Sequence, residues 1–298
     1  MNRKTIPLVP VLEALFAVIV WGGSFVATKV ALREVSPVTV VWLRFAMGVV
    51  ILGAAAIARK QISFPARKEL GYFVLLGFLG ITFHQWLQST GLVTSQASTT
   101  AWIVATTPVF MALLGWMMLG EKLVWLQIAG IFLAALGVLL VVTRGDLSQL
   151  AQGRIGTFGD LLILLSAPNW AVFSTLSRRG LQRYPAAQMM FYVMASGWLL
   201  TSVLFFLGSG PGEIHNLTWE GWLGIAFLGI FCSGLAYIFW YDALKALPVA
   251  QTGAFINLEP LVTVIVAALL LGEPVILASV LGGAIILLGV WLVNRPKT

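Results

Sequence analysis

The chain has 298 residues, of which 59% are hydrophobic and only 10% are charged, and its formal net charge is +7. Because a soluble domain carries about 25% charged residues, this composition excludes a soluble globular protein and predicts a polytopic membrane protein. The basic excess does not require a nucleic-acid partner, because the Lys and Arg residues gather in the breaks between apolar segments, as membrane topology demands.

Ten apolar segments follow one another along the chain. Each is close in length to the about 20 residues that a helix needs to cross a bilayer. The predicted segments are 11–32, 37–58, 70–91, 97–119, 123–143, 157–177, 185–207, 219–241, 249–271 and 275–294. Short polar breaks separate them, and the longest of these are 144–156 and 208–218. The predicted fold class is therefore an all-α integral membrane protein with ten transmembrane helices.

The distribution of Lys and Arg predicts the orientation. With the N-terminus in the cytoplasm, the far side would hold only Arg33, Arg144 and Arg154. The cytoplasmic side would hold Arg3, Lys4, Arg59, Lys60, Arg67, Lys68, Lys122, Arg178, Arg179, Arg183, Lys245, Arg295 and Lys297. Because cytoplasmic loops carry the excess of basic residues, we expect both termini in the cytoplasm of a bacterial cell, with the chain in the inner membrane.

One stretch occurs twice, at a shift of 152 positions. Residues 96–122 correspond to 248–274, so that Pro108 falls on Pro260 and Gly120 on Gly272. Each copy is an apolar helix with a proline near its middle, a Gly-Glu break and a second apolar helix. A period of this length indicates a duplicated half-molecule, and proline-broken segments at matching positions of two halves indicate a transporter's binding site.

The duplication predicts two repeats of opposite orientation. Each half contains five predicted helices, an odd number, so the second half must cross the membrane in the opposite sense to the first. We expect a first five-helix repeat over 1–143, an extracytoplasmic connecting loop over 144–156 and a second, inverted repeat over 157–298. Inverted halves give a transporter two related conformations, one open to each side.

This arrangement resembles a known family. The sequence WGGSF stands in the first helix at 21–25, LRF in the second at 43–45, and a proline precedes Gly-Glu by the same spacing in both halves. Together with ten helices in two halves, these features are similar to the ten-helix, EamA-type branch of the drug/metabolite transporter superfamily. Within it the chain looks most similar to bacterial exporters of amino acids, including aromatic ones, and this resemblance implies export.

Polar and aromatic residues inside the segments are the candidates for substrate contact, because burying polar groups in lipid is costly. At helical spacing they form stripes on six segments, which indicates one shared central cavity. The candidates are Trp21, Ser24, His84, Gln88, Trp102, Thr106, Asn169, Trp170, Tyr237, Trp240, Asn257 and Glu259, with Pro108 and Pro260 as helix kinks that serve gating. For Ser and Thr, hydrogen bonds to their own helix are the alternative interpretation.

Charged groups in the segments leave several interpretations open. Glu259 precedes Pro260, which frees a backbone carbonyl, and this pair suits an ammonium group or a proton, unless Glu259 is only a protonated structural residue. Arg44 is expected either to pair with a carboxylate or carbonyl or to snorkel, and Lys29, close to the outer end of its segment, is expected to snorkel. Glu121 and Glu273 are predicted to cap the helices that follow them.

The predicted function is therefore secondary transport of a small amphiphilic solute such as an amino acid, with the bilayer as the other partner. Nucleotide-binding and metal-binding motifs are absent from the sequence, so we expect no cofactor, no metal and no enzymatic activity. The alternatives are a passive channel or facilitator and an intramembrane serine hydrolase that uses Ser24 with His84. The sequence leaves the exact substrate, the coupling ion and the oligomeric state open.

Overall fold

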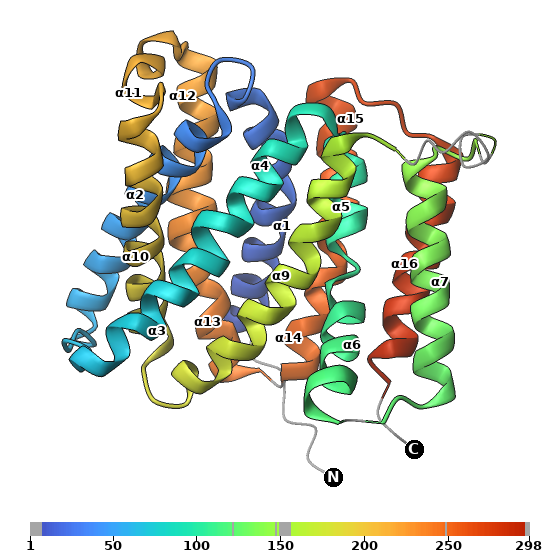
Figure 1. Cartoon of the computed structure of the whole chain (residues 1–298), viewed down its shortest axis with the longest axis horizontal. Coiled ribbons are helices and arrows are strands. Elements are labelled where there is room, and N and C mark those ends of the chain that lie inside the picture. Colours follow the sequence, from blue (N-terminus) through green and yellow to red (C-terminus); the bar gives the residue numbers. More distant parts are fainter. Residues whose placement is uncertain (1–7, 121, 147, 149–155, 248, 296–298) are drawn as a thin grey trace.

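A computed structural model describes residues 8–120, 122–146, 148, 156–247 and 249–295, and nearly all of them are helical (Figure 1). No strand occurs among them. The α-helices are α1 (Leu8–Ala31), α2 (Pro37–Ala58), α3 (Arg67–Gly77), α4 (His84–Thr94), α5 (Ala97–Val104), α6 (Thr107–Leu119), α7 (Trp125–Val142), α9 (Phe158–Leu181), α10 (Ala186–Leu207), α11 (Gly210–Glu213), α12 (Trp219–Ala226), α13 (Ala236–Ala246), α14 (Val249–Phe255), α15 (Glu259–Leu271) and α16 (Leu277–Val293).

Four shorter helical segments join these elements. Two are π-helices, η1 (Phe78–Phe83) and η3 (Phe227–Leu235), and two are 3₁₀-helices, η2 (Ile214–Asn216) and η4 (Ile256–Leu258). Joined end to end, the elements give nine spans in the described chain that are long and apolar enough to cross a membrane, and α16 is a shorter tenth. The prediction of an all-α membrane protein is confirmed.

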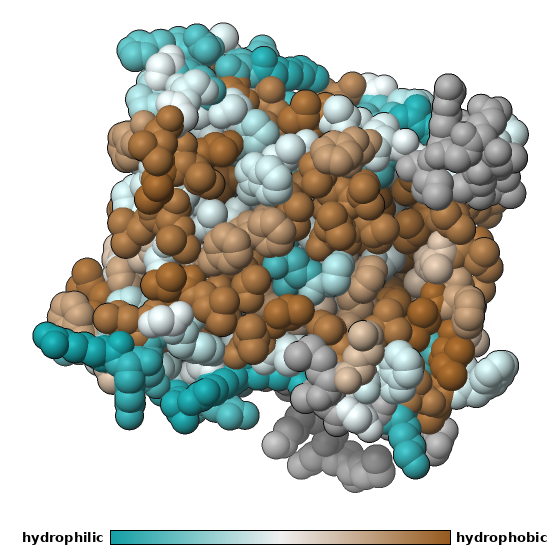
Figure 2. All heavy atoms as spheres, viewed as in Figure 1, coloured by the Kyte–Doolittle hydropathy of each residue, from teal (hydrophilic) through white to brown (hydrophobic). Residues whose placement is uncertain are grey.

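The surface agrees with a multi-pass membrane protein. Figure 2 shows an apolar band across the middle of the molecule, with hydrophilic residues gathered at its two ends. Many large apolar side chains of the described helices are exposed, among them Phe132, Leu199 and Leu269. Lipid is the solvent that suits such a surface, because apolar side chains facing water would be unfavourable.

The two ends of the bundle differ in what they carry. The helix α1 begins and α16 ends at one end, which we call the terminal face, and the connection between α7 and α9 lies at the opposite end, which we call the loop face (Figure 1). The helices α2, α5, α9, α12 and α16 begin at the loop face. Their N-terminal N–H groups therefore need acceptors there.

Matching irregularities occur in both halves of the chain. A break near Pro108 separates α5 from α6, and a break near Pro260 separates α14 from α15. Each proline stands in the first turn of the second helix, where its missing N–H costs little. We expected Pro260 to free a carbonyl inside a continuous helix, but the helix is interrupted there and α15 begins at Glu259. Both second helices end at a glycine in the left-handed region, Gly120 with φ of 67° and Gly272 with φ of 66°, a conformation that favours glycine.

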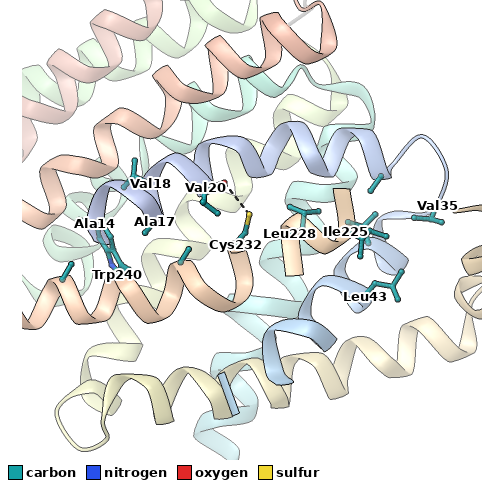
Figure 3. Packing of buried hydrophobic residues seen from close by; sticks show 14 residues of the cluster. Ala14, Ala17, Val18, Val20, Val35, Leu43, Ile225, Leu228, Cys232 and Trp240 are labelled. Carbon is teal, nitrogen blue, oxygen red and sulfur yellow. Dashed lines mark hydrogen bonds between the residues drawn. The ribbon is translucent and has the colours of Figure 1, made fainter. Parts of the chain in front are cut away.

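The core is built where small residues let helices approach each other. The helix α1 packs against η3 and α13 through a cluster that includes Ala14, Ala17 and Cys232, and the Cys232 thiol donates to the Val20 carbonyl at 3.5 Å (Figure 3). The helices α7 and α16 stand side by side in Figure 1. Their closest approach is at glycines, because a side chain on Gly130 would meet the Gly289 carbonyl at 2.6 Å.

Carboxylates from distant loops cap two helices at the loop face. The Glu213 carboxylate of α11 accepts hydrogen bonds from the Ser36 N–H at 2.8 Å and the Thr39 hydroxyl at 2.7 Å, at the start of α2. In the reverse direction, the Glu34 carboxylate after α1 accepts from the Thr218 N–H at 2.7 Å, at the start of α12. Each carboxylate thereby joins two parts of the chain and also meets the positive end of a helix dipole.

We expect Glu213→Gln to lower thermal stability in a pH-dependent manner. Burial raises the pKa of the Glu213 carboxyl, but hydrogen bonds from Ser209, Thr39 and Ser36 outweigh burial and lower the pKa from 4.5 to about 2. The carboxylate therefore stabilises the fold above pH 4.5 and loses this contribution as the pH falls toward 2. Because the group is partly exposed to solvent, we expect a loss of about 1 kcal/mol near neutral pH, well below the full shift.

Thermal unfolding in detergent at about pH 7 and about pH 3.5 measures this effect, since the two values lie on either side of the unfolded pKa. The difference between wild type and variant should shrink at the lower pH. Glu220→Gln is the matched control, because Glu220 is an exposed carboxylate in the first turn of α12. Equal melting temperatures of wild type and Glu213→Gln near neutral pH would contradict the capping role.

Candidate functional site

Three aromatic side chains from two helices form one group in the bundle. The ring centroid of Trp21 in α1 lies 5.5 Å from that of Tyr237 and 5.4 Å from that of Trp240, both in α13. The Trp21 indole N–H donates to the Cys232 carbonyl at 3.1 Å, which holds the ring against η3. Rings in this edge-on or tilted arrangement attract each other and combine apolar faces with polar N–H and O–H groups. We call Trp21, Tyr237 and Trp240 the aromatic group.

Glu259 lies directly beside the first helix. A side chain on Gly22 would meet the Glu259 carbonyl at 2.9 Å, so α1 and the start of α15 are in close contact. The Thr263 hydroxyl donates both to the Gly22 carbonyl at 2.8 Å and to the Glu259 carbonyl at 3.0 Å. Because Gly22 follows Trp21, this contact places the backbone of Glu259 against the turn of α1 that carries Trp21.

A second group joins α4 and α9. The His84 ring lies 4.6 Å from the Trp170 ring, which lies 4.8 Å from the Phe173 ring. Asn169 donates to the Leu79 carbonyl of η1 at 2.8 Å, and this bond fixes α9 against the π-helix. The Nδ1 atom of His84 is buried and has no hydrogen-bond partner among the described residues. The predicted partnership of His84 with Ser24 for hydrolysis is not among the contacts found for His84.

Arg44 joins η3 to α4, although it was not among the predicted site residues. Its Nε donates to the Ser233 hydroxyl of η3 at 3.1 Å, and its Nη1 donates to the Gln85 side-chain oxygen at 3.1 Å, next to His84. The side chain is only 7% exposed, so the guanidinium does not snorkel. A charged residue inside an apolar helix was the signal that could have placed it in the site.

Other predicted site residues lie elsewhere. Trp102 is buried against α16, where a side chain on Gly283 would meet its ring at 2.5 Å, and its indole N–H is unpaired in the described structure. The Thr106 hydroxyl donates to the Ile103 carbonyl of its own helix at 2.6 Å, as the alternative interpretation of such residues proposed. Asn257 is exposed in η4, whereas Gln88 is buried in α4 one turn beyond His84, and Ser24 is half-buried in α1.

The described pockets do not coincide with the aromatic group. One small pocket lies among α5, α15 and α16, and of the predicted residues it contains Trp102. Another lies at the terminal face between α3 and α9, lined by Lys68, Glu69, Tyr72, Arg179, Gly180, Arg183 and Tyr184. The shared central cavity that the stripes predict remains a prediction.

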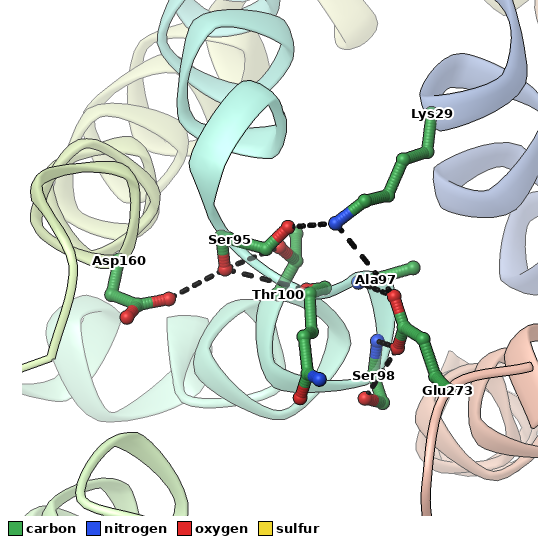
Figure 4. A network of polar contacts seen from close by, with 8 residues as sticks. Lys29, Ser95, Ala97, Ser98, Thr100, Asp160 and Glu273 are labelled. Atoms are coloured by element: carbon green, nitrogen blue, oxygen red, sulfur yellow. Dashed lines mark hydrogen bonds and ion pairs between the residues drawn. The ribbon is translucent and has the colours of Figure 1, made fainter. Parts of the chain in front are cut away.

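A network of hydrogen bonds and an ion pair joins several helices at the loop face (Figure 4). The Glu273 carboxylate accepts hydrogen bonds from the Ala97 N–H at 2.7 Å and the Ser98 N–H at 3.0 Å, and it lies 3.8 Å from the Lys29 ammonium. Lys29 also donates to the Ser95 carbonyl. The Ser95 hydroxyl donates in turn to Asp160, at the start of α9. Four helices, α1, α5, α9 and α15, are thereby joined.

Two predictions about charged residues are corrected by this network. Glu273 was expected to cap the helix that follows it, but α16 begins only at Leu277, and the carboxylate caps α5 instead. The reason is tertiary, because the loop after α15 lies against the first turn of α5. Lys29 was expected to snorkel, but Ser95 and Glu273 hold its ammonium. The corresponding prediction for Glu121 lies outside the described residues.

Comparisons with known proteins identify relatives over the whole chain. The model of the EamA-like transporter family matches residues 8–143 and 157–295. A protein of Archaeoglobus fulgidus named "Uncharacterized transporter" is 29% identical over 297 residues, covering 100% of this chain and 99% of that protein. A protein of Streptantibioticus cattleyicolor named "Probable terminal-alkyne amino-acid exporter" is 28% identical, covering 94% of this chain and 92% of that protein.

The fold is also known from experiment. One crystal structure resembles this chain with a TM-score of 0.65 over 96% of each chain, at 20% sequence identity. At that identity the likeness concerns the fold alone. The names of the relatives are those of transporters, in agreement with the expectation that the chain is not an enzyme.

We expect Glu273→Gln to lower stability more than solute affinity. The substitution removes the charge that caps α5 and pairs with Lys29, so the unfolding free energy should fall by about 1–2 kcal/mol. Thermal unfolding in detergent measures the loss. Lys29→Met is the comparison, and it should cost less, because the hydrogen bonds from Ala97 and Ser98 to Glu273 remain. A Glu273→Gln protein with unchanged melting and lost solute binding would overturn the structural assignment.

Proposed function

This chain belongs to the EamA-like transporter family, and we propose that it is a secondary transporter of small organic solutes that exports amino acids, including aromatic ones, by alternating access. The observation that carries the proposal is the aromatic group between α1 and α13, together with Glu259 at the start of α15, which packs against α1. Aromatic rings take up the apolar part of a solute, and a carboxyl group suits its ammonium.

Four more of the predicted residues, on α4 and α9, are assigned to the wall of the transport path. Trp170 with His84 would provide a second ring surface on α9 and α4. Gln88 and Asn169 supply amide groups on the same two helices. Glu259 serves either as the partner of an ammonium group or as a proton carrier, and the two roles differ in whether net transport depends on a pH gradient.

Similarity to a named exporter supports the choice of substrate. The relative from Streptantibioticus cattleyicolor is named for the export of a terminal-alkyne amino acid and is 28% identical to this chain. Such a solute joins a zwitterionic end to an apolar side chain. The aromatic group and Glu259 offer partners for both parts, so amino acids with apolar side chains are the substrates that fit.

Inverted repeats are the proposed basis of alternating access. The family model matches 8–143 and 157–295 separately, which supports a first repeat over 1–143, a loop over 144–156 and a second repeat over 157–298. The paired prolines, the left-handed glycines Gly120 and Gly272 and the two π-helices support the same division. In the described conformation the polar network around Glu273 closes the loop face. The alternate state would require that network to open.

The proposed location is the bacterial inner membrane, with both termini in the cytoplasm. The loops and helix ends at the terminal face carry Arg59, Lys60, Arg67, Lys68, Lys122, Arg178, Arg179, Arg183 and Lys245. The loop face carries carboxylates that are engaged with helix N-termini. This asymmetry supports a cytoplasmic terminal face.

Transport in proteoliposomes tests the function. We expect counterflow of labelled amino acids from a panel that includes phenylalanine, with saturation, because a carrier exchanges solute through a binding site. Trp170→Ala should weaken solute affinity about fivefold or more, since burial against the ring is lost. Trp291→Ala, which truncates an exposed ring on α16, is the matched control and should transport normally. Flux that does not saturate and shows no counterflow would indicate a channel.

Impermeant thiol reagents test the orientation. Cysteine placed at Ser148 or Ser209, both exposed at the loop face, should be labelled on intact cells. Cysteine placed at Gln182, which is exposed between α9 and α10, should be labelled only after lysis. The native Cys232 is buried and should give little background. The reverse pattern would place both termini outside the cytoplasm.

A further inference from the structure

Arg44 is a buried cation without an acidic partner in the described part of the chain. The ion pairs found there are Lys29 with Glu273, Arg59 with Asp242 and Arg183 with Glu69. Arg44 has instead two neutral acceptors, the Ser233 hydroxyl and the Gln85 amide oxygen. A guanidinium has five N–H donors, so these bonds leave donors for a further acceptor. A buried charge without a counter-charge is unfavourable, so an anionic ligand would stabilise the Arg44 guanidinium.

The fold holds this guanidinium between its two π-helices. Gln85 follows η1 by two residues, and Ser233 lies within η3. The helix α2 can reach η3 because Gly48, one turn beyond Arg44, has no side chain, and a Cβ there would meet the Ser233 Cβ at 2.8 Å. Isolated π-turns in α-helices are uncommon and frequently occur at functional sites. Arg44 thus donates to one residue within the π-helix η3 and to another just after the π-helix η1.

This position is adjacent to the proposed binding site. Ser233 precedes Tyr237 of the aromatic group by one turn, and Gln85 is next to His84. Arg44 donates to Ser233, the residue after Cys232, and the Cys232 carbonyl accepts from the Trp21 indole of the aromatic group. The two charges are not paired with each other, because Arg44 bonds Ser233 and Gln85 while Glu259 adjoins Gly22. A solute between them would find a cation near one end and a carboxyl near the other.

We propose that Arg44 binds the carboxylate of the transported solute, so that the substrates are zwitterions with Arg44 and Glu259 at their two ends and the aromatic group along their apolar part. This inference rests on the proposed function and deepens it. The planar guanidinium matches a carboxylate in a two-point arrangement, which an ammonium group does not. The competing role is structural, in which Arg44 only ties η1 to η3 through its two hydrogen bonds.

Three related solutes distinguish a carboxylate-binding role of Arg44 from a purely structural role. L-phenylalanine carries both charges, its methyl ester lacks the carboxylate charge, and phenethylamine lacks the carboxyl group altogether. Wild-type protein in proteoliposomes should take up phenylalanine by counterflow and prefer it over both analogues. In Arg44→Gln, phenylalanine affinity should fall about tenfold or more, as expected for a lost charged hydrogen bond, whereas affinity for phenethylamine should change less than about twofold.

Substitution of Gln85 tests the charge without removing Arg44. Gln85→Glu keeps an oxygen acceptor at the same place but supplies an internal carboxylate, which should compete with the solute and abolish the preference for phenylalanine. Gln85→Ala is the matched control, because it removes the same amide without adding charge, and it should keep that preference. This pair decides the question even where Arg44→Gln does not yield folded protein, since thermal unfolding reports the integrity of both variants.

The outcomes divide the two hypotheses. Equal loss of phenylalanine and phenethylamine uptake in Arg44→Gln, or a preference retained in folded Gln85→Glu, would overturn the carboxylate site and leave amino-acid transport standing. Equal handling of all three probes by the wild type would also overturn it. Counterflow of none of the amino acids in the panel by the wild type would refute the proposed function, and with it this inference.

Discussion

The arrangement of the bundle depends on how the N-terminal N–H groups of its helices are satisfied at the loop face. No water is available within a bilayer to accept these bonds, and near its surface the helix dipole favours a negative partner. Four helices that begin at this face receive a carboxylate: Glu213 at α2, Glu273 at α5, Asp160 at α9 and Glu34 at α12. In three of the four cases the carboxylate comes from a different part of the chain, so each cap also joins two helices in space.

A different interaction organises the middle of the membrane. Polar side chains are few there, and the guanidinium of Arg44 donates hydrogen bonds to two of them, Gln85 and Ser233. These two residues are 148 positions apart in the sequence. The same region contains the aromatic group on one side and the rings of His84 and Trp170 on the other. The carboxylates thus fix the ends of the helices, while a cation and aromatic rings occupy the interior.

Much of this architecture could be predicted from the sequence, because hydropathy and breaking residues act locally. The nine spans of the described chain with the shorter α16, and the breaks near Pro108 and Pro260, follow from lipid solvation and from the missing N–H of proline. The partners of the charged residues could not be predicted in this way. Glu273 was assigned to the nearest helix in sequence, but it caps α5 because a loop meets another helix in space. Gln85 gave no signal, since only its neighbour Arg44 makes it part of a site.

The π-helices have a consequence for the register of the site. A π-turn contains one residue more than an α-turn, and each residue in an α-helix turns the chain by about 100°. Side chains before and after η1 therefore belong to different faces than an unbroken helical repeat would give them, and the same is true of η3. Losing one residue from either segment would leave a helix still apolar and still long enough to span the bilayer. The π-turn would become an α-turn, and the surface beyond it would keep its direction. One residue lost from a regular α-turn would instead rotate that surface by about 100°, so the facing of these helices depends on residue count as much as on residue identity.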